Sequence, residues 1–426
     1  MSTRTVWHYP LIGRLGNTFY RSLLLFEQPM PAAILGGVIY LMFAMTAGVP
    51  WRISPNPYYN YLADAFLHGQ LNLRLIPTHT LDLSYYSGMY FLYWGPLPAI
   101  LLMPVVALFG VGVSDILQSL IVGTINAGLF ALLLRKACLS GVIDLSRTQR
   151  MLLVILFILG TPHTPLPAVG RVWELSSLLT VTFTLIAFLA AFSLEGRKAF
   201  VWTGIGIAGV MMTRISAVFI GVFLAWYLLR KYRSMSWNSL WKLSLAGLTP
   251  VLIAIALLAG YNWARFGSPL NNGLYYQLSG PDFIDNARQY GFFNLHYIWP
   301  NIYYQFLVYP FSLINGNFAV EGWGGSLFLL SPLFFAAPLA LWQDRRNPIT
   351  WVLLITILLL MIPLLVNIAP GTLQFGPRYT LDLIVPLFLL TALGIRRWPN
   401  WLVSTLVGIA LLHYLVGALM YAHLVA

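Results

Sequence analysis

The run LPAILLMPVVALF, from Leu97 to Phe109, decides how this chain is threaded through a membrane. It holds about 13 apolar residues, whereas a helix that crosses a bilayer needs about 20. Counting it as a span would invert every later loop and place Arg135 and Lys136 on the outer side, against the positive-inside rule. We therefore predict a juxtamembrane helix that lies in the outer leaflet without crossing it.

The composition excludes a water-soluble globule. The 426 residues are 59% hydrophobic and only 8% charged, while a soluble domain has about a quarter of its residues charged. The net charge of +12 does not indicate nucleic acid, because the basic residues are scattered in ones and twos between apolar runs. The single cysteine, Cys138, excludes an intramolecular disulfide, a Cys-based zinc site and an iron–sulfur cluster. The sequence thus predicts an all-α polytopic membrane protein.

Apolar runs compatible with spanning helices predict about 11 transmembrane helices. They lie near 31–49, 114–134, 151–168, 175–193, 199–213, 215–229, 243–262, 327–342, 349–368, 381–395 and 401–424. With a cytoplasmic N-terminus, seventeen of the 24 basic residues fall inside, and the seven outside are all arginines. This charge distribution also predicts an extracytoplasmic C-terminus.

The predicted spans divide the chain into four parts. Residues 1–30 lack the compact apolar core of a cleaved signal and are expected to form a cytoplasmic lead-in at the interface. Residues 31–262 form an N-terminal transmembrane module that includes a first outer loop, 50–114. A second outer loop with juxtamembrane helices covers 263–326, and C-terminal spans cover 327–426. Both loops are dense in Tyr, Trp, Asn, Pro and Gly, which favours ordered surfaces at the interface.

The first outer loop contains an amphipathic helical pattern. Leu62, Ala65 and Phe66 are apolar at helical spacing, and Asp64 and His68 are separated by one helical turn. A glycine at position 69 ends the pattern. We expect a helix that lies in the membrane plane.

From this loop onward the sequence resembles a known family. The motifs are LADAFLHGQLNL, DLSYYSG, WGPLPAILLMP and LFG between Tyr61 and Gly110, then Arg171-Val-Trp-Glu174, Met212-Thr-Arg214, Tyr261-Asn-Trp-Ala-Arg-Phe-Gly-Ser-Pro269 and Gly376-Pro-Arg-Tyr379. Together they are similar to bacterial GT-C glycosyltransferases of the protein O-mannosyltransferase and aminoarabinose transferase group. The resemblance implies an inverting transfer of a hexose or pentose from a polyprenyl-phosphate donor, with a loop carboxylate as base. Its expected place is the outer face of a bacterial inner membrane.

The sequence departs from that family just before the first loop helix. Many members carry adjacent acids there, whereas this chain has Asn56-Pro57. Asp82 is our first candidate for the base, against the alternative of an aspartate that caps its own turn. Asp64 is the second candidate, against the alternatives of a solvated residue or one paired with His68.

Charged residues at the outer ends of spans supply the other candidates. Arg171 and Glu174 lie one turn apart; Glu174 could act on the acceptor or a metal, or merely pair with Arg171. Arg378 is the best phosphate ligand, because a guanidinium contacts two phosphate oxygens at once. Arg214 and Arg265 are weaker candidates, because their side chains could instead extend to the membrane interface. The rest of the predicted substrate-binding set is Arg171, Arg265, Arg214, Tyr379 and Asn271.

No cofactor is certain, although a divalent metal ion is possible. His163 or His296 could complete an oxygen-rich site with Asp82 or Glu174, or could be ordinary interface residues. The aromatic run 292–311 could stack on sugar, hold isoprenoid tails or form an interfacial belt.

The predicted function is a membrane glycosyltransferase. Its expected partners are a polyprenyl-phosphate-linked sugar, a lipid or glycan acceptor and the membrane lipids. The alternative is a lipid-linked glycan flippase or transporter, which would show mid-span charges, broken helices and inverted repeats.

Overall fold

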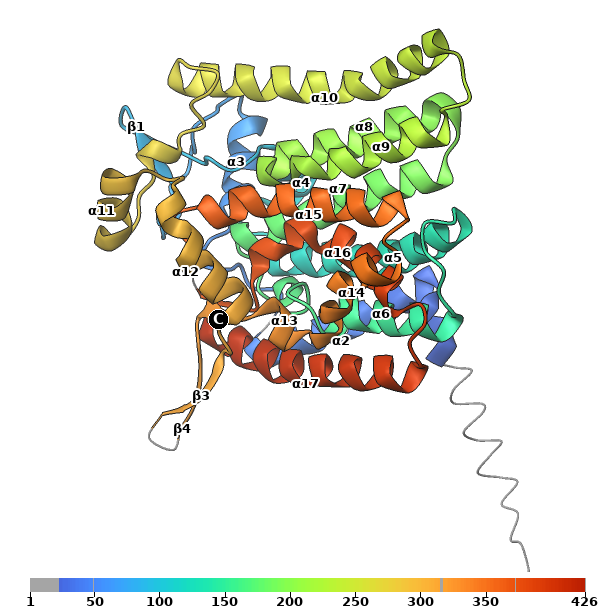
Figure 1. Cartoon of the computed structure of the whole chain (residues 1–426). Coiled ribbons are helices and arrows are strands. Elements are labelled where there is room, and N and C mark those ends of the chain that lie inside the picture. The colour runs from blue at the N-terminus through green and yellow to red at the C-terminus, as the bar shows by residue number, and fades with distance from the viewer. Residues whose placement is uncertain (1–22, 49, 315–316, 372, 426) are drawn as a thin grey trace, which may run out of the picture.

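The computed structural model describes residues 23–48, 50–314, 317–371 and 373–425 (Figure 1). Most of the predicted lead-in 1–30 lies outside the described residues. The described part of the chain is mostly helical, and the long helices run roughly side by side in one bundle. It is a multi-pass membrane protein by the length and apolar character of these helices.

Seven of the described helices are long and apolar enough to cross a membrane. They are α2 (Pro29–Ala47), α5 (Asp115–Leu139), α7 (Val172–Ser193), α10 (Trp237–Phe266), α15 (Pro348–Val366), η8 with α16 (Arg378–Leu383 and Ile384–Ile395) and α17 (Asn400–Val425). Of these, η8 with α16 is the most completely buried and α10 the least, so α16 lies at the centre of the bundle and α10 at its edge.

The predicted count of eleven spans is therefore not shown. The other four predicted runs form shorter or interrupted helices: α6 (Arg147–Leu159), α8 (Gly196–Thr213), η3 with α9 (Ile215–Phe219 and Ile220–Lys231), and the series α13 (Leu327–Leu330), η7 (Pro332–Phe335) and α14 (Ala336–Gln343). Local sequence accounts for the breaks. Helix α6 stops at Gly160 before a proline-containing turn, and Pro332 follows the end of α13.

The two predicted outer loops lie at the same end of the bundle (Figure 1). The first contains α3 (Tyr58–Leu67), a hairpin of β1 (Ser84–Tyr86) and β2 (Met89–Phe91), and α4 (Leu97–Phe109). Helix α4 has the bounds that the sequence predicts. Its 13 residues are too short to cross a bilayer.

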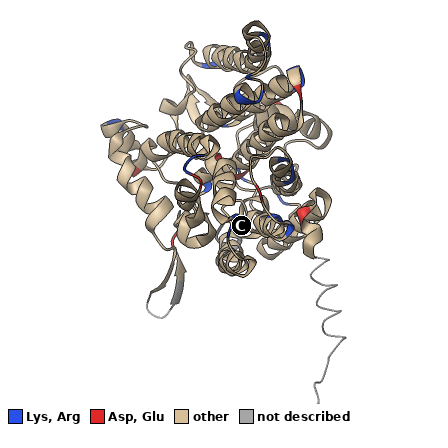
Figure 2. Ribbon diagram, turned by 45° about the vertical axis from the view of Figure 1, so that its right-hand side comes forward, with Lys and Arg blue, Asp and Glu red and all other residues tan. Residues whose placement is uncertain are grey.

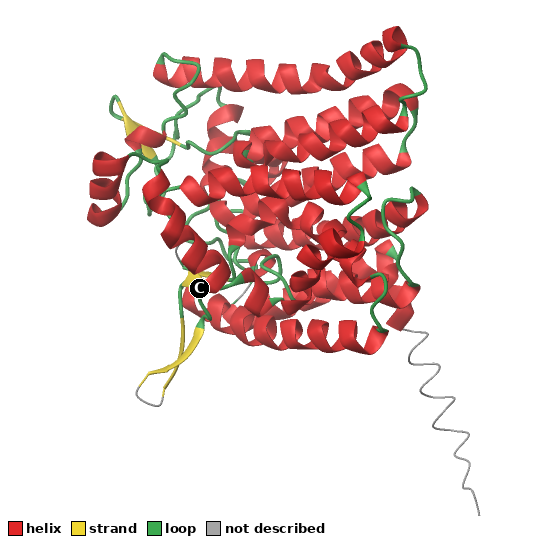
Figure 3. Cartoon of the chain, in the orientation of Figure 1, coloured by secondary structure: helices red, strands yellow, loops and turns green. Residues whose placement is uncertain are grey.

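The second loop contains short elements only. They are η4 (Leu274–Tyr276), α11 (Pro281–Tyr290), η5 (Leu295–Tyr297), α12 (Ile298–Ile302), the π-helix η6 (Tyr303–Leu307), and the strands β3 (Phe311–Ile314), β4 (Asn317–Val320) and β5 (Trp323–Gly324). Strands β3 and β4 form an antiparallel hairpin, while β5 pairs in parallel with β6 (Gln374–Phe375). The prediction of an all-α fold thus needs one correction: in the described part of the chain, three two-stranded sheets lie at the loop end (Figure 3).

At the opposite end of the bundle, ion pairs join the turns that carry the basic residues. Lys231 lies 2.9 Å from Glu195, and Arg396 lies 3.5 Å from Asp344. At the start of the described chain, η1 (Leu24–Glu27) supplies Glu27, which accepts a 2.9 Å hydrogen bond from Nε of Arg150. These contacts bring together turns that the charge pattern assigns to one side. Further charged residues lie within the bundle and on the loop elements (Figure 2).

Candidate active site

A cavity of about 680 Å³ opens at the loop end of the bundle. Both outer loops line it, together with the start of α7, the corner between α8 and η3, the end of α15 and the start of η8. The two most buried spans therefore begin at this cavity. Because the N-terminus of a helix carries partial positive charge, the location suits an anion.

Backbone hydrogen bonds join the two loops directly beside the cavity. The amide of Asp82 donates to the carbonyl of Leu278 at 2.8 Å, and the amide of Leu278 donates to the carbonyl of Leu83 at 2.8 Å. The hydroxyl of Ser84 donates to the carbonyl of Gly273, also at 2.8 Å. The first loop thus has a fixed register against the second.

Asp82 is the carboxylate that this junction presents to the cavity. Its Oδ2 accepts a 3.0 Å hydrogen bond from the indole of Trp173, and its Oδ1 accepts one of 2.6 Å from the amide of Gln277. Burial raises the pKa of Asp82, whereas the hydrogen bond from Gln277 and the charge of Arg378 act to lower it. Both carboxylate oxygens are thus held by neutral groups from other segments, which differs from an aspartate that caps its own turn.

The backbone at Asp82 is also unusual, with φ at 65°. A non-glycine residue in the left-handed region is strained, although Asp and Asn tolerate it better than other residues. Such strain tends to occur at functional sites.

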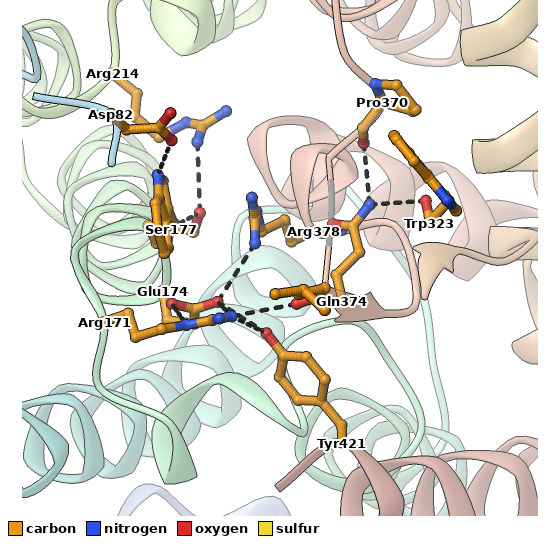
Figure 4. A network of polar contacts seen from close by, with 12 residues as sticks. Asp82, Arg171, Glu174, Ser177, Arg214, Trp323, Pro370, Gln374, Arg378 and Tyr421 are labelled. Atoms are coloured by element: carbon orange, nitrogen blue, oxygen red, sulfur yellow. Dashed lines mark hydrogen bonds and ion pairs between the residues drawn. The ribbon is translucent and has the colours of Figure 1, made fainter. Parts of the chain in front are cut away.

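Arg171, Glu174, Arg378 and Tyr421 form a buried network at the base of the cavity (Figure 4). Nη2 of Arg171 lies 2.7 Å from Oε1 of Glu174, and Nη1 of Arg378 lies 3.4 Å from the same oxygen. Each side chain in the network is at most 5% exposed. Two guanidinium groups therefore share one carboxylate, which leaves an excess of positive charge in this network.

Arg214 belongs to a second charged group on the cavity wall. Its Nε lies 3.1 Å from Oδ1 of Asp382, and the hydroxyl of Ser216 donates to Oδ2 of Asp382 at 2.7 Å. The guanidinium carbon lies 5.1 Å from the ring centroid of Tyr379 and 5.8 Å from that of Trp94. Arg214 is thus held in place by a carboxylate and two aromatic rings.

Gly95 fixes how closely the first loop approaches this corner. A Cβ atom at Gly95 would lie 2.1 Å from the carbonyl oxygen of Met212, so no side chain fits there. The neighbouring residue, Trp94, depends on this close packing for its position above Arg214.

Four predicted catalytic or substrate-binding residues do not line the cavity: Glu174, which is buried in the network beneath it, and Asp64, Arg265 and Asn271, which are held elsewhere. Asp64 is held by Arg74, whose Nε and Nη2 each donate to it at 3.0 Å. Arg265 donates to the carbonyl of Leu92 at 2.7 Å and lies against an aromatic ring of its own helix. The side chain of Asn271 accepts a hydrogen bond from the backbone amide two residues further along the chain. Its neighbour Asn272 lines the cavity instead.

The two histidine candidates for a metal site lie apart from the cavity lining. His163 is completely buried, 3.1 Å from the hydroxyl of Tyr40 and 3.3 Å from the amide of Asn126. The ring of His296 stacks on Tyr290 at 4.0 Å. Among the described residues, no group of three or more His, Cys, Asp and Glu side chains is arranged to hold a metal ion. A metal role for Asp82 and Glu174 stays a prediction.

The aromatic run 292–311 is divided between the cavity and the outer surface of the protein. Phe292 and Phe293 line the cavity beside Trp323, while Trp299 is 65% exposed on the outside. Only the first two residues of the run are therefore in position to contact a ligand in this cavity.

Several residues of the site have no role in the sequence-based prediction. Trp173 lies within the quoted Arg-Val-Trp-Glu motif, and Asp382 follows the Gly-Pro-Arg-Tyr motif by three residues. Proximity to these motifs could have indicated both. Gln277 and Tyr421 carry no such signal, because their contacts bridge 195 and 247 residues of sequence.

Comparison with known proteins gives similarity in fold. ArnT from Cupriavidus metallidurans in the apo state aligns with a TM-score of 0.52 and 12% identity over 86% of this chain and 60% of that chain. The apo oligosaccharyltransferase of Archaeoglobus fulgidus aligns with a TM-score of 0.52 and 13% identity over 93% of this chain and 55% of that chain. The chain therefore spans only about three fifths of the length of these proteins. A second structure of the Cupriavidus protein, bound to undecaprenyl phosphate, aligns with a TM-score of 0.49 and 13% identity over 86% of this chain and 61% of that chain.

No family model matches the chain, and no curated protein matches it in sequence. The structural similarity to GT-C glycosyltransferases nevertheless covers most of the chain at low identity. This confirms the predicted resemblance at the level of the fold.

Proposed function

We propose that the protein is an inverting glycosyltransferase that transfers a sugar from a polyprenyl-phosphate donor to a lipid or glycan acceptor. One observation carries the proposal: the carboxylate of Asp82 lines the same cavity as Arg171, Arg214 and Arg378. A carboxylate opposite a group of arginines is what a base-assisted displacement of a phosphate requires. The GT-C-like fold supports this reaction class.

The reaction joins an acceptor oxygen to the anomeric carbon of the donor sugar. The acceptor hydroxyl gives its proton to Asp82 as its oxygen attacks that carbon from the face opposite the phosphate. The bond between the anomeric carbon and the phosphate oxygen breaks, and its electron pair leaves with polyprenyl phosphate. The products are the glycosylated acceptor, with inverted configuration, and the phosphate.

The arginines would bind the phosphate and stabilise the charge that develops on it. Arg171 and Arg378 carry two positive charges against the one carboxylate of Glu174, so an anion can interact with the remaining charge. The positive ends of α7 and η8 add to this attraction. In this role Glu174 orients the arginines, whereas the sequence offered it as a group acting on the acceptor or a metal.

The cavity also presents apolar surface that suits an isoprenoid tail. Phe283, Phe292, Phe293, Leu364 and Ile368 line it, and they come from α11, the segment after it and the end of α15. A cavity of about 680 Å³ is within the usual range of about 300–1,000 Å³ for small-ligand sites. The donor head group would fit inside, with most of a long isoprenoid chain continuing into the membrane. A crystal structure of ArnT contains bound undecaprenyl phosphate.

The proposed location is the inner membrane of a bacterium, with the N-terminus cytoplasmic and the cavity on the extracytoplasmic side. The charge pattern supports this orientation, because most basic residues belong to the end opposite the cavity.

A transfer assay tests the proposal against the rival function of a flippase. Purified protein is incubated in detergent with a set of radiolabelled undecaprenyl-phosphate sugars and a lipid extract, and release of undecaprenyl phosphate is measured. We expect release together with a labelled acceptor. Translocation of the labelled donor across liposomes, without any release of phosphate, would instead identify a flippase.

A further inference from the structure

The last turns of the C-terminal helix α17 reach the base of the cavity. Most of this helix lies at the edge of the bundle, and only a third of its spanning part is buried. Tyr421, near its end, is nevertheless only 3% exposed. Its hydroxyl contacts Arg171 and Glu174, which are 250 and 247 residues away in the sequence (Figure 4).

The hydrogen bonds of Tyr421 have a definite direction. Its oxygen accepts from Nη2 of Arg171 at 2.5 Å, because a guanidinium can only donate. Its single proton therefore goes to Oε1 of Glu174, at 2.9 Å. That oxygen is also the one that faces Nη1 of Arg378 at 3.4 Å.

Oε1 of Glu174 thus lies near three donors, of which only Tyr421 is neutral. The contact of 2.7 Å with Arg171 is a full ion pair, while the contact of 3.4 Å with Arg378 is long for a charge-assisted hydrogen bond. A neutral donor on this oxygen reduces the negative charge that is available to Arg378. The guanidinium of Arg378 is then held less tightly by Glu174.

We propose that Tyr421 is a positioning residue for the anion site: its hydroxyl occupies Glu174 so that Arg378 can bind the donor phosphate. The inference rests on the proposed function, because it takes a polyprenyl phosphate as the ligand. It makes the end of the C-terminal helix part of the site. Tyr421 itself does not line the cavity, so it acts through the other two side chains.

Tyr414 provides a matched control on the same helix. It lies two turns before Tyr421, is completely buried and packs with its ring 5.4 Å from that of Phe375. Tyr414→Phe therefore controls for the loss of a buried hydroxyl from α17 that is not bonded to Arg171 or Glu174. A positioning role predicts that only the hydroxyl of Tyr421 affects the ligand.

The experiment compares Tyr421→Phe with Tyr414→Phe, each as the full chain in detergent. For Tyr421→Phe we expect the donor KM and the Kd for undecaprenyl phosphate alone to rise about 10-fold, the effect of one hydrogen bond to a charged group. The acceptor KM and the thermal midpoint should change little. For Tyr414→Phe we expect the donor KM and this Kd to stay unchanged. Equal effects of the two variants, or an unchanged Kd in Tyr421→Phe, would overturn the proposal.

A double-mutant cycle tests whether Tyr421 acts through Arg378. In an Arg378→Gln background, we expect Tyr421→Phe to raise the Kd by less than about 2-fold, because coupled residues are not additive. A full 10-fold effect in that background would show that Tyr421 does not act through Arg378.

The wild-type protein separates the two proposals. If it bound no undecaprenyl phosphate and transferred no sugar, the proposed function would be wrong and with it the ligand named here. If it bound the phosphate and Tyr421→Phe bound it equally well, only the role of Tyr421 would be wrong.

Discussion

The carboxylate of Asp82 accepts a 2.6 Å hydrogen bond from the side-chain amide of Gln277, which lies 195 residues further along the chain. The two residues come from different outer loops. The second loop thus holds the residue of the first loop that we assign as the base. This contact leads to a prediction on pH dependence.

Replacing Gln277 by leucine should move the acidic limb of the pH–rate profile to higher pH. The base must be deprotonated, so activity rises as pH passes the pKa of Asp82. Burial already raises this pKa, and Gln277 opposes the rise by stabilising the charged form. Without its amide the pKa increases further. The measurement is kcat/KM between about pH 4 and 8; a limb that moves to lower pH, or does not move, would contradict the assignment of Asp82.

Asp82→Asn should lower kcat by roughly 100- to 10,000-fold, the usual contribution of a general base. Asparagine tolerates the left-handed backbone at this position, so the fold should persist. The control is Asp64→Asn, which removes the partner of Arg74 outside the cavity and should be much milder. Near wild-type turnover of Asp82→Asn would move the base to another carboxylate.

Arg378→Lys should slow transfer by roughly 10- to 150-fold, because lysine keeps the charge and loses the planar two-point contact. An arginine that only reached toward lipid head groups would tolerate lysine. Arg288→Lys is the control, since Arg288 is 78% exposed on α11. Donor affinity and turnover measured in detergent distinguish the two cases, and unchanged values for Arg378→Lys would refute a phosphate contact.

Gly95→Ala should destabilise the protein and impair the cavity. The new Cβ would overlap the carbonyl oxygen of Met212, and overpacking of this kind costs about 1–3 kcal/mol. Gly112→Ala is the matched control, because a Cβ at Gly112 meets nothing within 4 Å. Thermal midpoints in detergent should fall for the first variant only.

Cysteine labelling tests the orientation in the membrane. With Cys138 replaced by alanine, Tyr85→Cys and Leu270→Cys place thiols at exposed positions of the two outer loops, and Leu139→Cys places one at the opposite end. A membrane-impermeant reagent added to intact spheroplasts should label the first two and not the third. Ser84 is unsuitable for this purpose, since it is completely buried. Labelling of Leu139→Cys alone would show that the protein has the opposite orientation in the membrane.

The sequence was informative where the physical constraint is local. Proline and glycine set the bounds of α4, which the structure reproduces to the residue. Asp64 and His68, one helical turn apart at the end of α3, are also close in space as predicted, because Nδ1 of His68 lies 3.6 Å from Oδ1 of Asp64. The predicted count of eleven spans is not shown, since seven described helices are long and apolar enough to cross and apolar composition does not reveal where a run such as 327–342 is interrupted.

Five of the predicted site residues, all from the quoted motifs, lie together in the structure, and their roles stay predictions. Asp82, Arg171, Arg214, Arg378 and Tyr379 all line the cavity. Charge and location alone did not distinguish these from Arg265 and Asn271, because a residue at a helix end can point into a cavity or along its own loop. The contacts of Gln277 and Tyr421 arise only from tertiary packing, and no local pattern predicts them.

The sharing of Glu174 between Arg171 and Arg378 also has a thermodynamic consequence. Buried like charges repel, and both guanidinium groups interact with the same carboxylate. The unliganded protein therefore gives up some folding stability to keep this region cationic, as functional sites often do. A bound anion relieves the repulsion in the folded state alone, so by mass action it should raise the melting temperature. Thermal stabilisation could then serve to screen phosphorylated lipids before any acceptor is identified.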